Sequence, residues 1–226
     1  MIGLPKSGTV WLHQLLADCL EIPVQLRFMP ENVADLLLPG VVKSHGGLEG
    51  LDHGLFERRG DLLHGVYLMR DVRDIVVSLF HYVHTDDYRT NTDPSLASYD
   101  DIEAFYFEAF LSYFVRHHDW FVHAERWVAI GFPLVRYEGL WENPRGELER
   151  LFARWGLEVK ADSIEKAVAR NAISRMQKIK GLNPAGVSAA HYRRGGCGGY
   201  LEEFPPRVLA DMDRRFGDLL RRWGYD

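Results

Sequence analysis

Met1-Ile-Gly-Leu-Pro-Lys-Ser-Gly-Thr-Val-Trp-Leu12 is the most informative part of the sequence, because a short apolar strand here runs into a polar turn that opens a helix. The backbone N–H groups from Ser7 onward have no partner within the first helical turn, and the helix dipole favours an anion beside them. Lys6 adds a positive charge, Ser7 and Thr9 add hydroxyl donors, and Gly8 supplies backbone freedom. The stretch therefore predicts a phosphate-binding loop.

A second candidate for anion binding follows a buried strand. Gly65-Val-Tyr-Leu-Met-Arg70 is apolar up to its last residue, so we expect Arg70 at the carboxyl end of a strand. Residues 71–80 continue with helical periodicity, which places Ser78 about two turns into a helix. Ser78 would then reach a ligand held by Arg70 only if the chain doubles back. Taken alone, Arg70 also fits a surface arginine in a salt bridge.

The candidate for a catalytic base lies between these two elements. In Gly40-Val-Val-Lys-Ser-His-Gly-Gly47, the two valines predict a short strand that is followed by Lys43 and His45. Open α/β sheets bind ligands at the carboxyl ends of their strands. A histidine with an ordinary pKa of about 6.5 suits a general base, although the chain has 10 histidines. The position of His45 beside Lys43 distinguishes it from the others, and a structural or surface histidine is the alternative.

The order of residues in the first loop separates two classes of phosphate-binding protein. Nucleotide triphosphatase loops carry their lysine after the second glycine, whereas here Lys6 precedes Gly8 and Trp11 follows. Pro-Lys-Ser-Gly-Thr-x-Trp resembles the 5′-phosphosulfate loop of the cytosolic-type sulfotransferases, which use 3′-phosphoadenosine 5′-phosphosulfate (PAPS). Arg70 and Ser78, eight residues apart, resemble the element of that family that binds the 3′-phosphate.

The segment around His45 resembles the Lys-Thr-His motif of the same family. This resemblance implies that His45 takes the proton from an acceptor hydroxyl and that Lys43 helps to hold the sulfonate. It also implies that Lys6 stabilises charge on the bridging oxygen of the leaving group. The expected catalytic residues are thus His45, Lys6 and Lys43.

Three further segments match the family in the expected order. Residues 132–144 resemble a passage whose tyrosine faces the adenine, which here is Tyr137, and residues 171–176 resemble a segment that contacts the nucleotide. The loop 192–200 resembles one that closes over the 3′-phosphate, and its two adjacent arginines suit an anion clamp. An amphipathic helix and a flexible basic loop are the alternatives for the last two segments.

Taken together, the resemblance implies that these residues bind the cofactor: Lys6, Ser7, Gly8, Thr9, Val10, Trp11, Arg70, Ser78, Tyr137, Asn171, Met176, Arg193, Arg194 and Gly195. No metal is expected, because lysines and backbone donors take the role that Mg²⁺ has in kinases. Val10 replaces a second threonine of the family loop. The dimerisation motif of the family is not matched near residues 201–210, so a dimer of the family type is not expected.

Composition favours a globular enzyme and argues against some partners. The 226 residues are 46% hydrophobic with a net charge of −5, which suits one domain over 1–226 and argues against a general nucleic-acid surface. No run approaches the roughly 20 apolar residues of a membrane span, and no leader-like segment is evident. The two cysteines lack metal spacing and suit a reducing cytoplasm. A cytoplasmic location is therefore expected.

Apolar strands at about 1–5, 22–24, 41–43, 65–70 and 133–137 alternate with helices at about 8–20, 72–84, 100–125, 144–155, 162–172 and 206–223. Such alternation predicts an α/β fold with a mostly parallel sheet flanked by helices on both faces, because parallel strands need crossover connections. Asn143-Pro144 predicts a helix start, and residues 90–99 a polar loop.

The expected function is transfer of a sulfonate group from PAPS to a small, hydrophobic hydroxyl acceptor. The aromatic runs 80–84 and 105–114 could line an acceptor pocket, but aromatic residues at helical spacing more often form core. An amine acceptor remains open. The alternatives from other classes are a Mg²⁺-dependent nucleotide phosphotransferase and a non-catalytic nucleotide-binding module, which would tolerate loss of His45.

Overall fold

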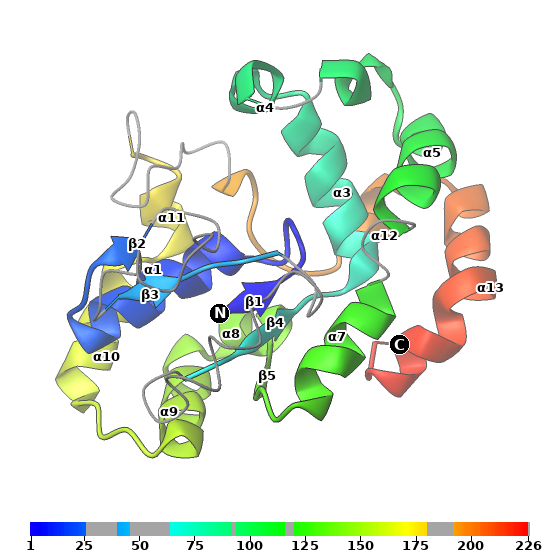
Figure 1. The fold of residues 1–226 in the computed structure, drawn as a ribbon. Helices are drawn as coiled ribbons and strands as arrows, with labels where there is room; N and C mark the ends of the chain where they lie inside the picture. The colour runs from blue at the N-terminus through cyan, green and yellow to red at the C-terminus, as the bar shows by residue number, and fades with distance from the viewer. Residues whose placement is uncertain (26–39, 46–63, 92–93, 116–119, 180–191, 226) are drawn as a thin grey trace.

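The computed structural model describes residues 1–25, 40–45, 64–91, 94–115, 120–179 and 192–225. At its centre three parallel strands, β1 (Ile2–Gly3), β4 (Tyr67–Met69) and β5 (Leu134–Arg136), lie in the order β1-β4-β5. Two further parallel strands, β2 (Val24–Gln25) and β3 (Val41–Val42), form a second pair. A bridge between Ile2 and Ser44 joins that pair to β1. Strands occur in all five predicted places, and the prediction of a parallel sheet is confirmed (Figure 1).

Helices cover both faces of the central strands (Figure 1). Successive side chains of β4 point to opposite faces, so Tyr67 and Met69 belong to one core cluster, whereas Val66 and Leu68 belong to the other. All four are at most 1% exposed. A strand buried on both faces needs apolar residues throughout, which explains the continuous apolar run before Arg70.

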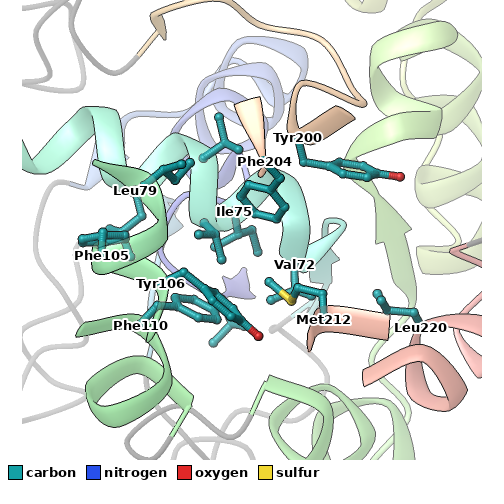
Figure 2. Packing of buried hydrophobic residues seen from close by; sticks show 14 of the residues in the cluster. Val72, Ile75, Leu79, Phe105, Tyr106, Phe110, Tyr200, Phe204, Met212 and Leu220 are labelled. Carbon is teal, nitrogen blue, oxygen red and sulfur yellow. The ribbon is translucent and has the colours of Figure 1, made fainter. Parts of the chain in front are cut away.

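The first core cluster joins α3 (Val72–Val83), α7 (Trp120–Ala129) and α13 (Pro206–Arg222) to the sheet. Figure 2 shows Val72, Ile75 and Leu79 of α3 packed among Phe105, Tyr106, Phe110, Phe204 and Met212. The aromatic side chains at 105, 106 and 110 are buried core, as their helical spacing favours.

The second core cluster lies on the opposite face of the sheet. It is formed with α1 (Thr9–Leu20), α9 (Pro144–Trp155) and α10 (Ala161–Arg170). The Asn143 side chain caps α9 by accepting a hydrogen bond from the Gly146 N–H at 3.0 Å, so the predicted helix start is confirmed.

Several elements differ from the expectation. The helix expected at about 100–125 is replaced by the short α5 (Ile102–Ala104), a π-helix η5 (Phe105–Phe114) and α7, with residues 116–119 outside the described part. The expected loop at 90–99 includes the end of α4 (Asp86–Asn91) and a 3₁₀ helix, η4 (Pro94–Ser98).

Four short α-helices among the described residues were not predicted from the sequence. They are α4, α8 (Tyr137–Glu142), α11 (Ile173–Met176) and α12 (Tyr200–Glu203). Isolated helices of four to six residues are too short to be stable without tertiary contacts, so local periodicity does not reveal them. Within the described ranges, no helix combines the length and apolar character required to cross a membrane.

Candidate active site

A cavity of about 410 Å³ lies where β1, β4 and β5 end and α1 and α3 begin. Residues from six separate segments of the chain line it. The residues expected from the sequence that line this cavity are Lys6, Gly8, Thr9, Val10, Trp11, Lys43, His45, Arg70, Ser78, Tyr137, Arg193, Arg194 and Gly195. The tertiary structure thus brings the three candidate catalytic residues and most of the candidate binding residues to one place.

The loop before α1 owes its shape to two residues in the left-handed backbone region. Lys6 has φ 67° and Gly8, which precedes the first residue of α1, has φ 94°. A Cβ on Gly8 would come within 2.5 Å of the Tyr137 ring. Both the backbone angle and the close approach of this ring therefore require glycine at position 8.

Ser7 does not act as the sequence predicts. Its hydroxyl donates to the Leu4 carbonyl at 2.7 Å, and its backbone N–H donates to the same carbonyl at 3.2 Å. The side chain is completely buried, and Ser7 does not line the cavity. The prediction that Ser7 offers an unpaired N–H and a hydroxyl donor is wrong, because the turn uses both groups to hold itself together.

The cationic side chains of the cavity repel one another, which makes the charged form of Lys6 less stable. Burial, together with the neighbouring charges of Arg70, Lys43 and Arg193, lowers the pKa of Lys6 to about 7, while Asp87 opposes this shift. Burial also lowers the pKa of Lys43. The Lys6 ammonium lies 3.8 Å from the centre of the Tyr82 ring, whose electron-rich face partly compensates its charge. A site with this excess of positive charge is suited to bind an anion.

Arg70 connects the first loop with the glycine-rich loop 195–199. Its Nη1 donates to the Lys6 carbonyl at 3.1 Å and its Nη2 donates to the Gly196 carbonyl at 3.1 Å, while the guanidinium stacks 4.2 Å above the Tyr137 ring. Its Nε is buried and has no hydrogen-bond partner among the described residues. Ser78 lines the same cavity although α3 is continuous from Val72 to Val83, so the chain does not need to double back.

His45 lies after β3, and its ring orientation is fixed by β1. Its Nδ1 is 2.5 Å from the Gly3 carbonyl oxygen. A carbonyl oxygen only accepts hydrogen bonds, so Nδ1 carries the proton and Nε2 is the unprotonated nitrogen of the neutral ring. This tautomer suits a general base that acts through Nε2.

The two arginines just before the glycine-rich loop line the cavity but pair with carboxylates of α12. Arg193 contacts Glu203 at 3.1 Å, and Arg194 makes two bonds of 2.9 Å to Glu202. About half of the Arg194 side chain is exposed. Because Arg194 bonds Glu202 through both terminal nitrogens, an anion in the cavity would compete with Glu202 for this guanidinium.

Two expected nucleotide contacts lie outside the cavity lining. The Asn171 side chain donates to Asp18 and Ala167, and its backbone carbonyl accepts a hydrogen bond from the Trp11 indole at 2.8 Å. Met176 is 4% exposed and packs in the second core cluster. The Asn171 carbonyl therefore holds the Trp11 indole in place by a hydrogen bond, and the Met176 side chain is part of the second core cluster.

The cavity lining also includes residues that were not selected from the sequence. Asp74, Tyr82, Tyr88 and Leu79 all line it. Asp74 lies four residues after Arg70, within the run from Arg70 to Ser78 that resembles the 3′-phosphate element, and Tyr82 belongs to the aromatic run 80–84. In the described part of the chain, no group of three or more His, Cys, Asp or Glu side chains could hold a metal ion.

The chain is thus an α/β protein in which a strand-to-helix loop and a cluster of cationic side chains line one cavity at the carboxyl ends of the strands. Residues 1–224 match the sulfotransferase domain family, and the chain belongs to that family. The membership expected from the sequence motifs is confirmed.

Curated relatives and solved structures agree with this family. The chain is 23% identical over 249 residues to sulfotransferase 2B1 of Homo sapiens, covering 98% of this chain and 65% of that protein. It is 24% identical over 212 residues to sulfotransferase 1A1 of Bos taurus, covering 82% of this chain and 68% of that protein. The structure superposes on mouse sulfotransferase SULT7A1 complexed with PAP with a TM-score of 0.77 at 22% identity, covering 97% and 82% of the two chains.

Proposed function

We propose that this protein transfers a sulfonate group from PAPS to a hydroxyl of a small, hydrophobic acceptor. The observation that carries the proposal is the convergence of Lys6, Lys43, Arg70 and His45 on one cavity in a chain of the sulfotransferase family. These four residues come from three segments, each at the carboxyl end of a different strand.

The residues of the cavity fit an anionic nucleotide. Arg70 has a buried Nε without a partner among the described residues, and Lys6 is half-buried beside the cationic groups of Arg70, Lys43 and Arg193. We assign the 5′-phosphosulfate to Lys6 and the start of α1, where backbone N–H groups favour an anion. We assign the 3′-phosphate to Arg70, Ser78, Arg193 and Arg194, and the adenine to the wall formed by Trp11 and Tyr137, whose rings meet edge to face at 5.8 Å.

When bound, PAPS supplies a sulfonate carried by a phosphate leaving group. His45 Nε2 accepts the proton of the acceptor hydroxyl, and its bond to the Gly3 carbonyl keeps the ring in the required tautomer. Lys6 and Lys43 place positive charge where negative charge develops. Because these groups are held by strand ends, catalysis comes mainly from positioning and electrostatic stabilisation.

A hydrophobic acceptor is supported by the apolar part of the cavity. Leu79, Tyr82 and Tyr88 line it, the Tyr82 ring lies beside Lys6, and Tyr88 is 6% exposed. One solved neighbour is a retinol dehydratase in complex with androsterone and inactive cofactor PAP, at a TM-score of 0.62. The sequence identity between that enzyme and this chain is 18%, so the match supports the fold alone.

The test measures nucleotide binding and turnover separately. Calorimetric titration with adenosine 3′,5′-bisphosphate (PAP) in EDTA should give metal-independent binding that is lost in Arg70→Ala. His45→Ala should keep this binding and lose turnover with phenolic or alcoholic acceptors. The control, His64→Ala, changes an exposed histidine outside this cavity and should leave both unchanged.

The alternatives give different results in the same experiments. Preference for ATP with Mg²⁺ over PAP would indicate a phosphotransferase and overturn the proposed cofactor. PAP binding without sulfonate transfer to any hydroxyl or amine acceptor would indicate a nucleotide-binding module. Full turnover in His45→Ala would exclude His45 as the base.

A further inference from the structure

One buried carboxylate in the cavity wall has no role in the proposed chemistry. Asp74 lies in the first turn of α3 and is 3% exposed. Its Oδ2 accepts a hydrogen bond from the Gly198 N–H at 2.8 Å, and its Oδ1 accepts one from the Tyr200 N–H at 3.3 Å. A single side chain thus fixes two backbone groups that are more than 120 residues away in sequence.

The same carboxylate lies beside the candidate phosphate-binding arginine. Asp74 Oδ2 is 4.0 Å from Arg70 Nη2, and that Nη2 donates to the Gly196 carbonyl. Arg70 therefore holds the loop 195–199 by a carbonyl, while Asp74 holds it by the N–H groups of Gly198 and Tyr200. The Arg70 guanidinium thus binds a carbonyl group, and the Asp74 carboxylate binds N–H groups, of the same short backbone segment.

The loop needs such anchors because its own sequence gives it little order. Gly195, Gly196 and Gly198 have φ values of 68°, 88° and 76°, in the region that favours glycine. Glycine loses the most conformational entropy on being fixed. Without contacts to a buried partner, this loop would sample many conformations, and Arg193 and Arg194 just before it would face the cavity for only part of the time.

We propose that Asp74 is a positioning residue for the cofactor, which fixes the glycine-rich loop so that Arg193 and Arg194 meet the same phosphate as Arg70. This inference rests on the proposed function. Asp74 does not itself contact the anion, because both of its oxygens accept bonds from the backbone. Its contribution to affinity is preorganisation, since a loop that is already ordered does not have to be ordered by the ligand.

The matched pair of variants is Asp74→Asn and Asp71→Asn. Asp71 is a buried carboxylate on the same helix end, but it caps α3 and pairs with Arg73 outside the cavity. An asparagine at position 74 keeps one acceptor oxygen, so one of the two loop N–H bonds is lost and the other loses its charge assistance. We expect calorimetric PAP affinity to fall about tenfold in Asp74→Asn and by less than about twofold in Asp71→Asn.

A second measurement does not depend on a variant that folds. In the wild-type protein, NMR hydrogen exchange at the Gly198 and Tyr200 N–H groups should be slow without ligand and slower still with PAP. Asp74→Glu, which keeps the carboxylate, should recover part of the lost affinity.

The outcomes separate the two proposals. If the wild-type protein does not bind PAP, the proposed function fails. If the wild-type protein binds PAP and Asp74→Asn binds it equally well, the role of Asp74 fails while the function stands. Equal losses in Asp74→Asn and Asp71→Asn, or unprotected exchange at Gly198 and Tyr200 in both states, would also overturn the role of Asp74.

Discussion

Lys6 is expected to take up a proton when PAP binds. Its pKa is lowered to about 7 by burial and by Arg70, Lys43 and Arg193, so about 9% of the side chains carry a proton at pH 8 in the unliganded protein. A bound phosphate opposes the cationic neighbours and raises this pKa towards the ordinary value of about 10.4, where protonation at pH 8 is nearly complete. Binding should therefore take up about 0.9 proton at pH 8, about 0.5 at pH 7 and about 0.1 at pH 6. The uptake falls at low pH because Lys6 is already charged there.

The assay is calorimetric titration of PAP at pH 8 in two buffers with different ionisation enthalpies. At this pH the ligand phosphates, with a second pKa near 6, no longer contribute protons. Lys6→Arg is the control, because a guanidinium does not titrate in this range, so the uptake assigned to Lys6 should be lost. Uptake below about 0.2 proton in the wild-type protein, or equal uptake in Lys6→Arg, would refute the electrostatic argument.

Three further predictions concern the same loops. Gly8→Ala should lower the free energy of unfolding by about 2 kcal/mol in urea denaturation, because of its positive φ and the Tyr137 ring; a loss under about 0.5 kcal/mol would mean that the loop relaxes. Ser7→Ala should cost about 1 kcal/mol of stability and leave PAP affinity unchanged, since its hydroxyl bonds within the loop; a tenfold weaker affinity would place Ser7 in the site. Glu202→Gln should release Arg194 and tighten PAP binding about threefold at low salt, with the gain lost near 0.5 M salt; weaker binding would show that Glu202 supports the loop.

Local sequence signals predicted the elements whose shape depends on nearby residues. The strand, turn and helix around Lys6 and Gly8 follow from an apolar run, a glycine and a helix start that are adjacent in the chain. The cap at Asn143 depends on a bond to an N–H three residues away. Such interactions have the same geometry in most proteins, so residue type and spacing are sufficient to predict them.

Residue type alone was insufficient where several local arrangements are similar in energy. A serine hydroxyl in a loop can point into a cavity or back to its own backbone, and in this chain it bonds to Leu4. The aromatic run 105–114 fits an α-helix by its spacing, yet it forms a π-helix in which Phe105, Tyr106 and Phe110 are buried. Packing in the core selects among such alternatives.

The parallel α/β architecture, the strand-to-helix loop at Lys6 and membership of the sulfotransferase family were all predictable from the sequence, because they depend on periodicity and on motifs of adjacent residues. Only the tertiary structure decided that Ser78 reaches the cavity along a continuous helix, that Asn171 supports Trp11, and that Asp74 fixes the loop at Gly198. These relations join segments up to 160 residues apart. Their geometry is set by how helices pack on the sheet, and no local pattern in the chain encodes that packing.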